Sequence, residues 1–138
     1  MIATAAEVNG FWLDEVGEKG WYDSSAKLDQ SIRDRFMETW ENAATLAPGW
    51  IATPEGALAA LILTDQFPRN MFRNDPRAFA TDRLARSIAD IAIGAGFVRR
   101  IDPPARQFFY LPFEHSEDLA DQDRCIALFD AYMPGENL

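Results

Sequence analysis

One segment constrains the fold of this chain more than any other, because it is apolar on every side of a helix. It reads Ala57-Leu58-Ala59-Ala60-Leu61-Ile62-Leu63, and a helix without a polar face has to be enclosed by other elements. Just before it, Thr53-Pro54-Glu55 combines a capping hydroxyl, a proline at the first helical position and an acid near the positive helix end. We therefore predict a buried central helix over residues 57–66, which Pro68 ends.

Helical spacing continues on both sides of this segment, and no alternation typical of a strand is sustained. We predict an all-α fold of five to six helices in antiparallel pairs, forming a single domain over residues 1–138. We expect two sets of apolar residues to face inward: Phe79, Leu84, Ile88, Ile91 and Ala92, and, on the last helix, Leu119, Ile126, Phe129 and Met133. The other predicted helices run from Thr4 to Gly17, from a cap at Asp23, Ser24 or Ser25 to Pro48-Gly49, from Asp75-Pro76 to Gly94 or Gly96, from Pro103-Pro104 to Pro112, and from a cap at Ser116 to Met133.

Composition excludes several classes of partner. The chain carries 13 Lys and Arg against 22 Asp and Glu, a net charge of −9, so it is a poor general binder of nucleic acid or of anionic membranes. We expect no membrane partner and, because the start lacks the features of a signal peptide, a cytoplasmic location. One histidine and one cysteine give no metal-ligand spacing, so we expect neither a metal nor a cofactor. Cys125 is predicted to be a packing residue.

Two polar strings flank buried segments. The first is Asp65-Gln66-Phe67-Pro68-Arg69-Asn70, followed by Arg73, and it puts Asp65 on the helix row of Leu58 and Leu61. A carboxylate there needs a cation, for which Arg69 and Arg106 are the natural partners. The second string contains His115 with Glu114, Glu117 and Asp118 close by, and acidic neighbours favour a charged histidine.

We predict that Asp65, Arg69, Arg106 and His115 form one polar cluster, with His115 near Glu117 or Asp118. Two interpretations stay open: a buried ion-pair network that fixes a helix end, or the lining of a pocket. The candidate binding residues are Asp65, Gln66, Arg69, Asn70, Arg73, Arg106, Tyr110, His115, Glu117 and Asp118. No catalytic role can be assigned to them individually, because phosphate-loop, dinucleotide and nucleophile-elbow motifs are absent.

Several strings together resemble a bacterial family, the domain-of-unknown-function family nine hundred and twenty-four. They are Phe11-Trp12, Trp21-Tyr22, Leu63-Thr64-Asp65-Gln66-Phe67-Pro68-Arg69-Asn70, Ala78-Phe79-Ala80-Thr81-Asp82 and Tyr110-Leu111-Pro112-Phe113-Glu114-His115-Ser116-Glu117-Asp118. The resemblance covers about Val8 to Phe129. It implies an all-helical, tetratricopeptide-like superhelical fold and assigns no activity.

Two functions follow as hypotheses. The first is a non-enzymatic interaction module that holds a peptide or protein, by analogy with tetratricopeptide-like folds. The second is a small-molecule enzyme or sensor that holds a small anionic ligand. Its pocket would be made from Asp65, Gln66, Arg69, Asn70, Arg106, Tyr110, His115 and Glu117. A homodimer is a further expectation, in which a second subunit covers an exposed helix face.

Overall fold

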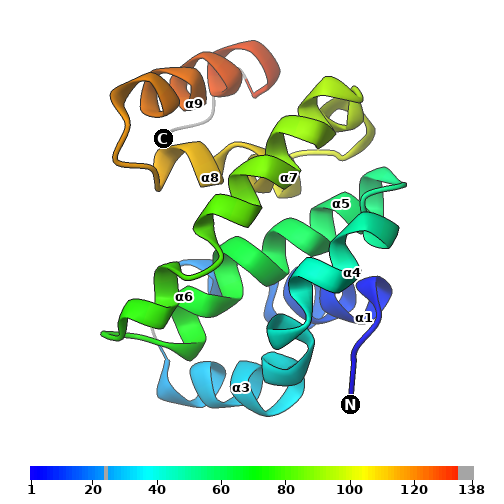
Figure 1. Cartoon of the computed structure of the whole chain (residues 1–138), viewed down its shortest axis with the longest axis vertical. Helices are drawn as coiled ribbons and strands as arrows, with labels where there is room; N and C mark the ends of the chain where they lie inside the picture. Colours follow the sequence, from blue (N-terminus) through cyan, green and yellow to red (C-terminus); the bar gives the residue numbers. More distant parts are fainter. Residues whose placement is uncertain (24, 134–138) are drawn as a thin grey trace.

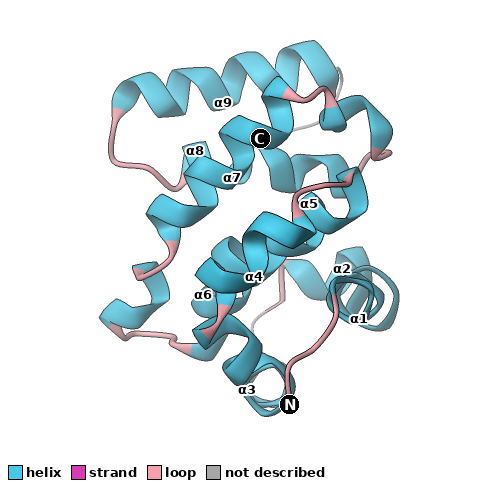
Figure 2. Ribbon diagram, turned by 45° about the vertical axis from the view of Figure 1, so that its right-hand side comes forward, coloured by secondary structure: helices cyan, strands magenta, loops and turns pink. Residues whose placement is uncertain are grey.

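A computed structural model describes residues 1–23 and 25–133, and every regular element within these residues is helical (Figure 2). This confirms the all-α prediction; Ser24 and residues 134–138 lie outside the described residues. The α-helices are α1 Ala5–Asn9, α2 Gly17–Trp21, α3 Ala26–Glu41, α4 Ala43–Trp50, α5 Pro54–Leu61, α6 Phe67–Met71, α7 Asp82–Gly94, α8 Leu111–Glu114 and α9 Leu119–Tyr132. Two π-helical turns, η1 Gly10–Val16 and η2 Ile62–Gln66, and three 3₁₀ turns, η3 Pro76–Phe79, η4 Phe97–Arg100 and η5 Ala105–Phe109, join them.

The central helix is the axis of the molecule. In Figure 1, α5 crosses the middle between α9 at one end and α3 at the other. It packs against α1, α4 and α7, and every residue from Gly56 to Asp65 is buried. The apolar run therefore lies where its lack of a polar face requires it, and the predicted buried central helix is confirmed.

Pro68 does not end this helix, contrary to the prediction. The amide of Phe67 reaches back five residues to the carbonyl of Ile62, which makes η2 a π turn that leads directly into α6. Because proline has no N–H, the carbonyl of Thr64 needs another donor. The hydroxyl of Thr81 supplies it, at 2.7 Å. The wide turn thus carries the chain past the proline, and Asp65 lies within it.

Capping signals place most helix starts correctly. Thr4 and Glu7 form a capping box at α1, Ser25 caps α3 and Thr53 caps α5. Ser116 was expected to cap the last helix, but the carboxylate of Asp118 accepts the hydrogen bond from Ala120. The hydroxyl of Ser116 instead donates to Asp121.

Two other predicted boundaries are wrong. The helix expected from the Ser25 cap to Pro48-Gly49 breaks at Asn42, whose amide side chain donates to the carbonyl of Glu38 and so competes with the helical backbone. The chain restarts as α4, which includes the proline. Asp75 caps only the short turn η3, so α7 begins at Asp82 rather than at Pro76.

Four residues expected to face inward are exposed. Phe79 lies on η3, where it is 63% exposed, and Ile91, Leu119 and Ile126 are also exposed. The buried residues of α9 are Cys125 and Phe129, which lie on the side that packs on α8. Spacing alone could not distinguish this row of α9 from the row of Leu119 and Ile126.

Gly56 gives a test of how tightly α5 is held. A Cβ built on it would lie 1.9 Å from the backbone oxygen of Trp50, so the backbone has to move to accept any side chain. We expect Gly56→Ala to lower the free energy of unfolding by about 1–3 kcal/mol, although alanine is the better helix former. Gly10→Ala is the control, because nothing lies within 4 Å of that Cβ. Urea denaturation of both variants measures the difference, and equal stabilities would contradict the close approach.

Candidate functional site

Asp65 is the centre of a polar network at the π turn. Its side chain is 2% exposed, and its Oδ1 accepts from His115 Nδ1 at 2.9 Å and from Arg69 Nη1 at 3.3 Å. Its Oδ2 accepts from Gln66 Nε2 at 3.1 Å. Three donors thus compensate the burial of this carboxylate.

Arg69 uses both of its terminal nitrogens for hydrogen bonds inside the protein. Its two terminal nitrogens form a bidentate pair with the carboxylate of Asp82, at 2.9 and 3.0 Å, and Nη1 also donates to the backbone oxygen of Asp65 at 2.7 Å. Asp82 is in the first turn of α7. The guanidinium therefore ties the end of the central helix to α7, and it has little capacity left for a ligand.

His115 lies at the end of α8, with its side chain 24% exposed. Its Nδ1 faces a carboxylate that can only accept, so in the neutral ring the hydrogen is on Nδ1 and the lone pair on Nε2. His115 lines two cavities.

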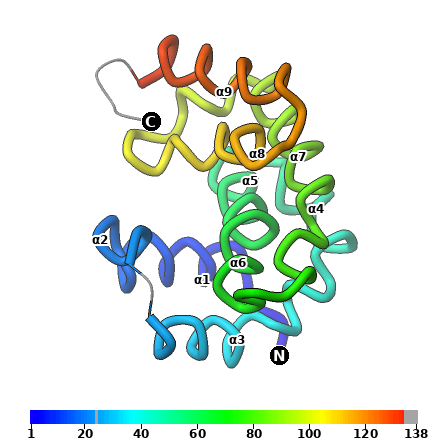
Figure 3. The backbone as a smooth tube through the Cα atoms, turned by 90° about the vertical axis from the view of Figure 1, so that its left-hand side faces the viewer, coloured from blue at the N-terminus to red at the C-terminus, as the bar shows by residue number. Residues whose placement is uncertain are grey.

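We call the first of these cavities the aromatic cleft. It has a volume of about 520 Å³ and lies between α2, the segment with η5 and α8, and α9, which Figure 3 shows in this order from the middle to the top. The hydroxyl of Tyr22 donates to Gln107 Oε1 at 3.0 Å and so joins the two sides. The lining residues are Trp21, Tyr22, Gln66, Gln107, Phe108, Leu111, Glu114, His115 and Phe129.

The second cavity, of about 430 Å³, lies beside the start of α9. Glu117 and Asp118 line it together with His115, Asp82 and Arg86. His115 was predicted to lie near Glu117 or Asp118, and it shares a cavity wall with both. Its hydrogen bond, however, is to Asp65.

Asn70 and Arg73 belong to a different cluster. Both donate to Asp29 of α3, Asn70 at 3.0 Å and Arg73 through two bonds at 2.8 and 3.0 Å. Burial alone would raise the pKa of Asp29, but these hydrogen bonds outweigh it and hold the pKa below its usual value. The pair stabilises the fold at neutral pH, and this contribution is lost as the pH falls through the lowered pKa.

Arg106 and Tyr110 do not join the cluster, contrary to the prediction for Arg106. Arg106 donates to the backbone oxygens of Ile101 and Tyr132, at 2.8 and 2.7 Å, and so fastens the end of α9. Tyr110 is completely buried beside Phe129, and burial raises the pKa of its hydroxyl. Asp65 needs no second arginine, because His115 and Gln66 provide the remaining donors.

Sequence reasoning missed the roles of Asp82, Tyr22 and Gln107. Asp82 binds Arg69 across thirteen positions, and Tyr22 meets Gln107 across eighty-five. Such pairs cannot be predicted from local spacing, although two adjacent aromatic residues, Trp21 and Tyr22, stand where α2 ends.

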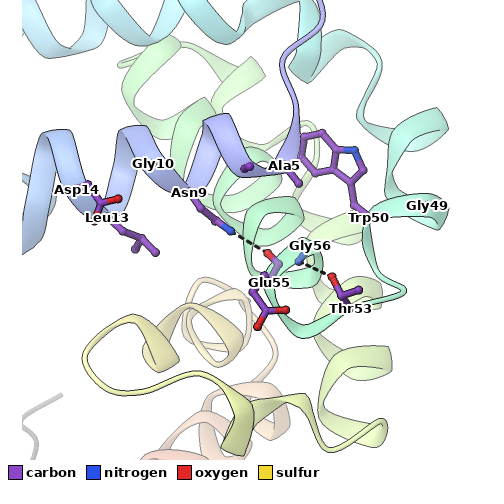
Figure 4. A pocket seen from close by; sticks show the side chains of 11 residues that line it. Ala5, Asn9, Gly10, Leu13, Asp14, Gly49, Trp50, Thr53, Glu55 and Gly56 are labelled. Carbon is purple, nitrogen blue, oxygen red and sulfur yellow. Dashed lines mark hydrogen bonds between the residues drawn. The ribbon is translucent and has the colours of Figure 1, made fainter.

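Another cavity, of about 530 Å³, lies where α1 and η1 meet α4 and the start of α5 (Figure 4). Polar groups of its wall are hydrogen-bonded to one another: Asn9 Nδ2 donates to the backbone oxygen of Glu55, and Gly56 N donates to Thr53 Oγ1. None of the residues that line it belongs to the network around Asp65. We therefore take the aromatic cleft as the candidate site.

Burial, with the carboxylate of Glu114 nearby, raises the pKa of the Cys125 thiol to about 11, which suits the predicted packing role. In the described residues, no group of three or more His, Cys, Asp or Glu side chains is arranged to hold a metal ion. None of the helices in residues 1–23 and 25–133 has the length and apolar character needed to span a membrane.

Comparison with known proteins supports the resemblance seen in the sequence. Residues 8–137 match the model of a family described as bacterial protein of unknown function, DUF924. The solved structure of a protein of unknown function, ATU0120 from Agrobacterium tumefaciens, is similar at 41% sequence identity with a TM-score of 0.88. The match covers 92% of this chain and 72% of that one. No curated protein matches.

Proposed function

This chain belongs to the DUF924 family of bacterial proteins of unknown function, and on that premise we propose that it binds a small molecule in the aromatic cleft, with Asp65 and His115 as a proton-accepting pair. The observation that carries the proposal is the 2.9 Å contact between His115 Nδ1 and the buried Asp65, at the wall of a cavity. A histidine oriented by a carboxylate in this way is a common general base.

The chemistry open to this pair is proton transfer. In the neutral ring, Nε2 can accept a proton from a hydroxyl or amine of the bound molecule, and Asp65 then stabilises the imidazolium that forms. None of the described residues that line the cleft is a serine, threonine, cysteine or lysine. The proposal is therefore direct proton transfer, or activation of a water, without a serine, threonine, cysteine or lysine nucleophile.

The anionic ligand expected from the sequence has less support. The arginines that the sequence suggested for an anion are used inside the protein, because Arg69 and Arg73 pair with carboxylates and Arg106 with backbone oxygens. Each of these arginines satisfies an acceptor of the protein itself.

The interaction module stays a prediction and is the second candidate. Its support is a set of exposed apolar side chains on α7 and α9, which are Ile91, Leu119 and Ile126. Leu119 and Ile126 are two helical turns apart and share a face of α9.

Analytical ultracentrifugation of the protein and of an Ile126→Ser variant tests the homodimer. A dimer that the substitution dissociates supports it, and a monomer at all concentrations contradicts it.

The first test of the proposed function uses the fact that the chain has one histidine. We expect ¹⁵N NMR to show the ring protonated on Nδ1 near neutral pH. We also expect members of a library of small polar aromatic compounds to shift its ring signals. If no compound that binds the protein perturbs His115, the cleft is not the site.

The variant His115→Ala separates binding from stability. Loss of one hydrogen bond to a partner that keeps other donors is expected to cost about 1–2 kcal/mol of unfolding free energy, while compounds found with the wild type no longer bind. Asn70→Ala is the matched control, because it removes one donor from the Asp29 cluster and leaves the cleft intact. Urea denaturation and NMR titration measure both effects, and retained binding in His115→Ala would contradict the proposal.

A further inference from the structure

We infer that the ligand of the aromatic cleft is an organic cation, with an ammonium or guanidinium group on an apolar body. The inference rests on the proposed function and narrows its ligand to one chemical class. It follows from the hydrogen-bonding capacity that the cleft has left, from the rings of its wall and from its charge.

The side-chain donors of the cleft are largely used within the protein. Each of the polar lining groups that carries hydrogen has at least one internal acceptor. These bonds run from Trp21 Nε1 to the backbone oxygen of Trp12, from Tyr22 Oη to Gln107 Oε1, from Gln66 Nε2 to Asp65, from Gln107 Nε2 to the backbone oxygen of Pro104, and from His115 Nδ1 to Asp65. One amide hydrogen on each glutamine is what remains for a ligand.

The acceptors of the cleft, by contrast, are open. Glu114 is exposed, and its carboxylate has no ion-pair partner among the described residues. The Oε1 of Gln66 and the Nε2 of His115 also lack a partner there. A ligand that satisfies these three groups has to bring N–H or O–H donors.

The wall of the cleft favours positive charge on that donor group. Trp21, Tyr22, Phe108 and Phe129 line it, and the rings of Trp21 and Phe108 lie 4.8 Å apart, edge to face. The negative ring faces of such residues attract cations. Elsewhere in the described residues arginines lie over aromatic rings, but none lies over these four.

The net charge around the cleft also favours a cation. Around the histidine, the carboxylates of Asp65 and Asp82 pair with Arg69, and the second cavity adds the carboxylates of Glu117 and Asp118 against the guanidinium of Arg86. Glu114 adds a further negative charge at the cleft itself. With His115 neutral the region is negative, so a cation is attracted and an anion is repelled.

The experiment compares three probes that share a phenyl ring and differ in charge: phenethylammonium, 2-phenylethanol and phenylacetate. NMR titration follows the ring signals of His115 in the wild-type protein. We expect phenethylammonium to shift them and to bind about tenfold more tightly than the alcohol, with no binding of the carboxylate. Equal or tighter binding of the alcohol or the carboxylate at His115 overturns the cation inference but leaves the proposed function standing.

Variants assign the effect to the cleft. Glu114→Gln is expected to weaken binding of phenethylammonium about fivefold and to leave that of the alcohol unchanged. Glu117→Gln, which removes the same charge from the second cavity, is expected to leave both unchanged. Equal losses in the two variants would indicate general attraction by an acidic protein and would overturn the inference, as would the absence of any shift with phenethylammonium. The proposed function fails separately, if no compound of the wider library perturbs His115.

Discussion

Leu61→Asp is expected to leave no cooperatively folded protein. Leu61 is 1% exposed at the point where α5 passes into the π turn η2, with Leu58 and Ile62 buried beside it. The substitution removes a well-packed side chain and puts an unpaired carboxylate where water cannot reach it. The combined cost exceeds the roughly 5–15 kcal/mol by which domains of this size are stable.

Circular dichroism during thermal unfolding measures this result, and Leu119→Asp is the matched control. Leu119 is 74% exposed at the start of α9, where an acid is favourable to the helix dipole. The control is expected to melt as the wild type does. A cooperative melting transition in Leu61→Asp would show that the central helix is not enclosed.

Asp65→Ala is expected to have the second-largest effect, a loss of about 3–5 kcal/mol in unfolding free energy. The substitution leaves donors of His115, Arg69 and Gln66 without their acceptor in a buried region. Arg69 keeps its bidentate pair with Asp82, so the loss arises from the whole set of donors rather than from one stranded arginine.

Urea denaturation measures the loss, and two further variants locate its cause. Asp90→Ala removes an exposed ion pair with Arg124 and is expected to cost about 1 kcal/mol or less. Asp65→Asn keeps the shape of the side chain but not its charge, so ¹⁵N NMR should show His115 losing its preference for the hydrogen on Nδ1. A stable Asp65→Ala variant with an unchanged histidine would contradict the network.

The helical character of the chain could be predicted because it depends on neighbours within one or two turns. The hydroxyls of Thr4, Ser25 and Thr53 each meet an amide three residues on, and an apolar run needs enclosure whatever encloses it. The need of Asp65 for hydrogen-bond donors could be predicted in the same way, because its spacing places it on a buried row of the helix. Which residues donate to it could not. The tetratricopeptide-like pairing of helices, in contrast, stays a prediction.

The identity of the partners was decided by the tertiary structure alone. Asp82 and Arg106 are both distant from Asp65 along the sequence. Nothing in their spacing shows that Asp82 pairs with Arg69, while Arg106 bonds to the end of α9. Pro68 continues a helix because the hydroxyl of Thr81, thirteen positions later, satisfies the freed carbonyl. The sequence by itself determined which groups could not remain unpaired, since burial and backbone chemistry are local properties. Which groups pair with them depends on how elements distant along the chain are packed, and that packing also places His115 between two cavities.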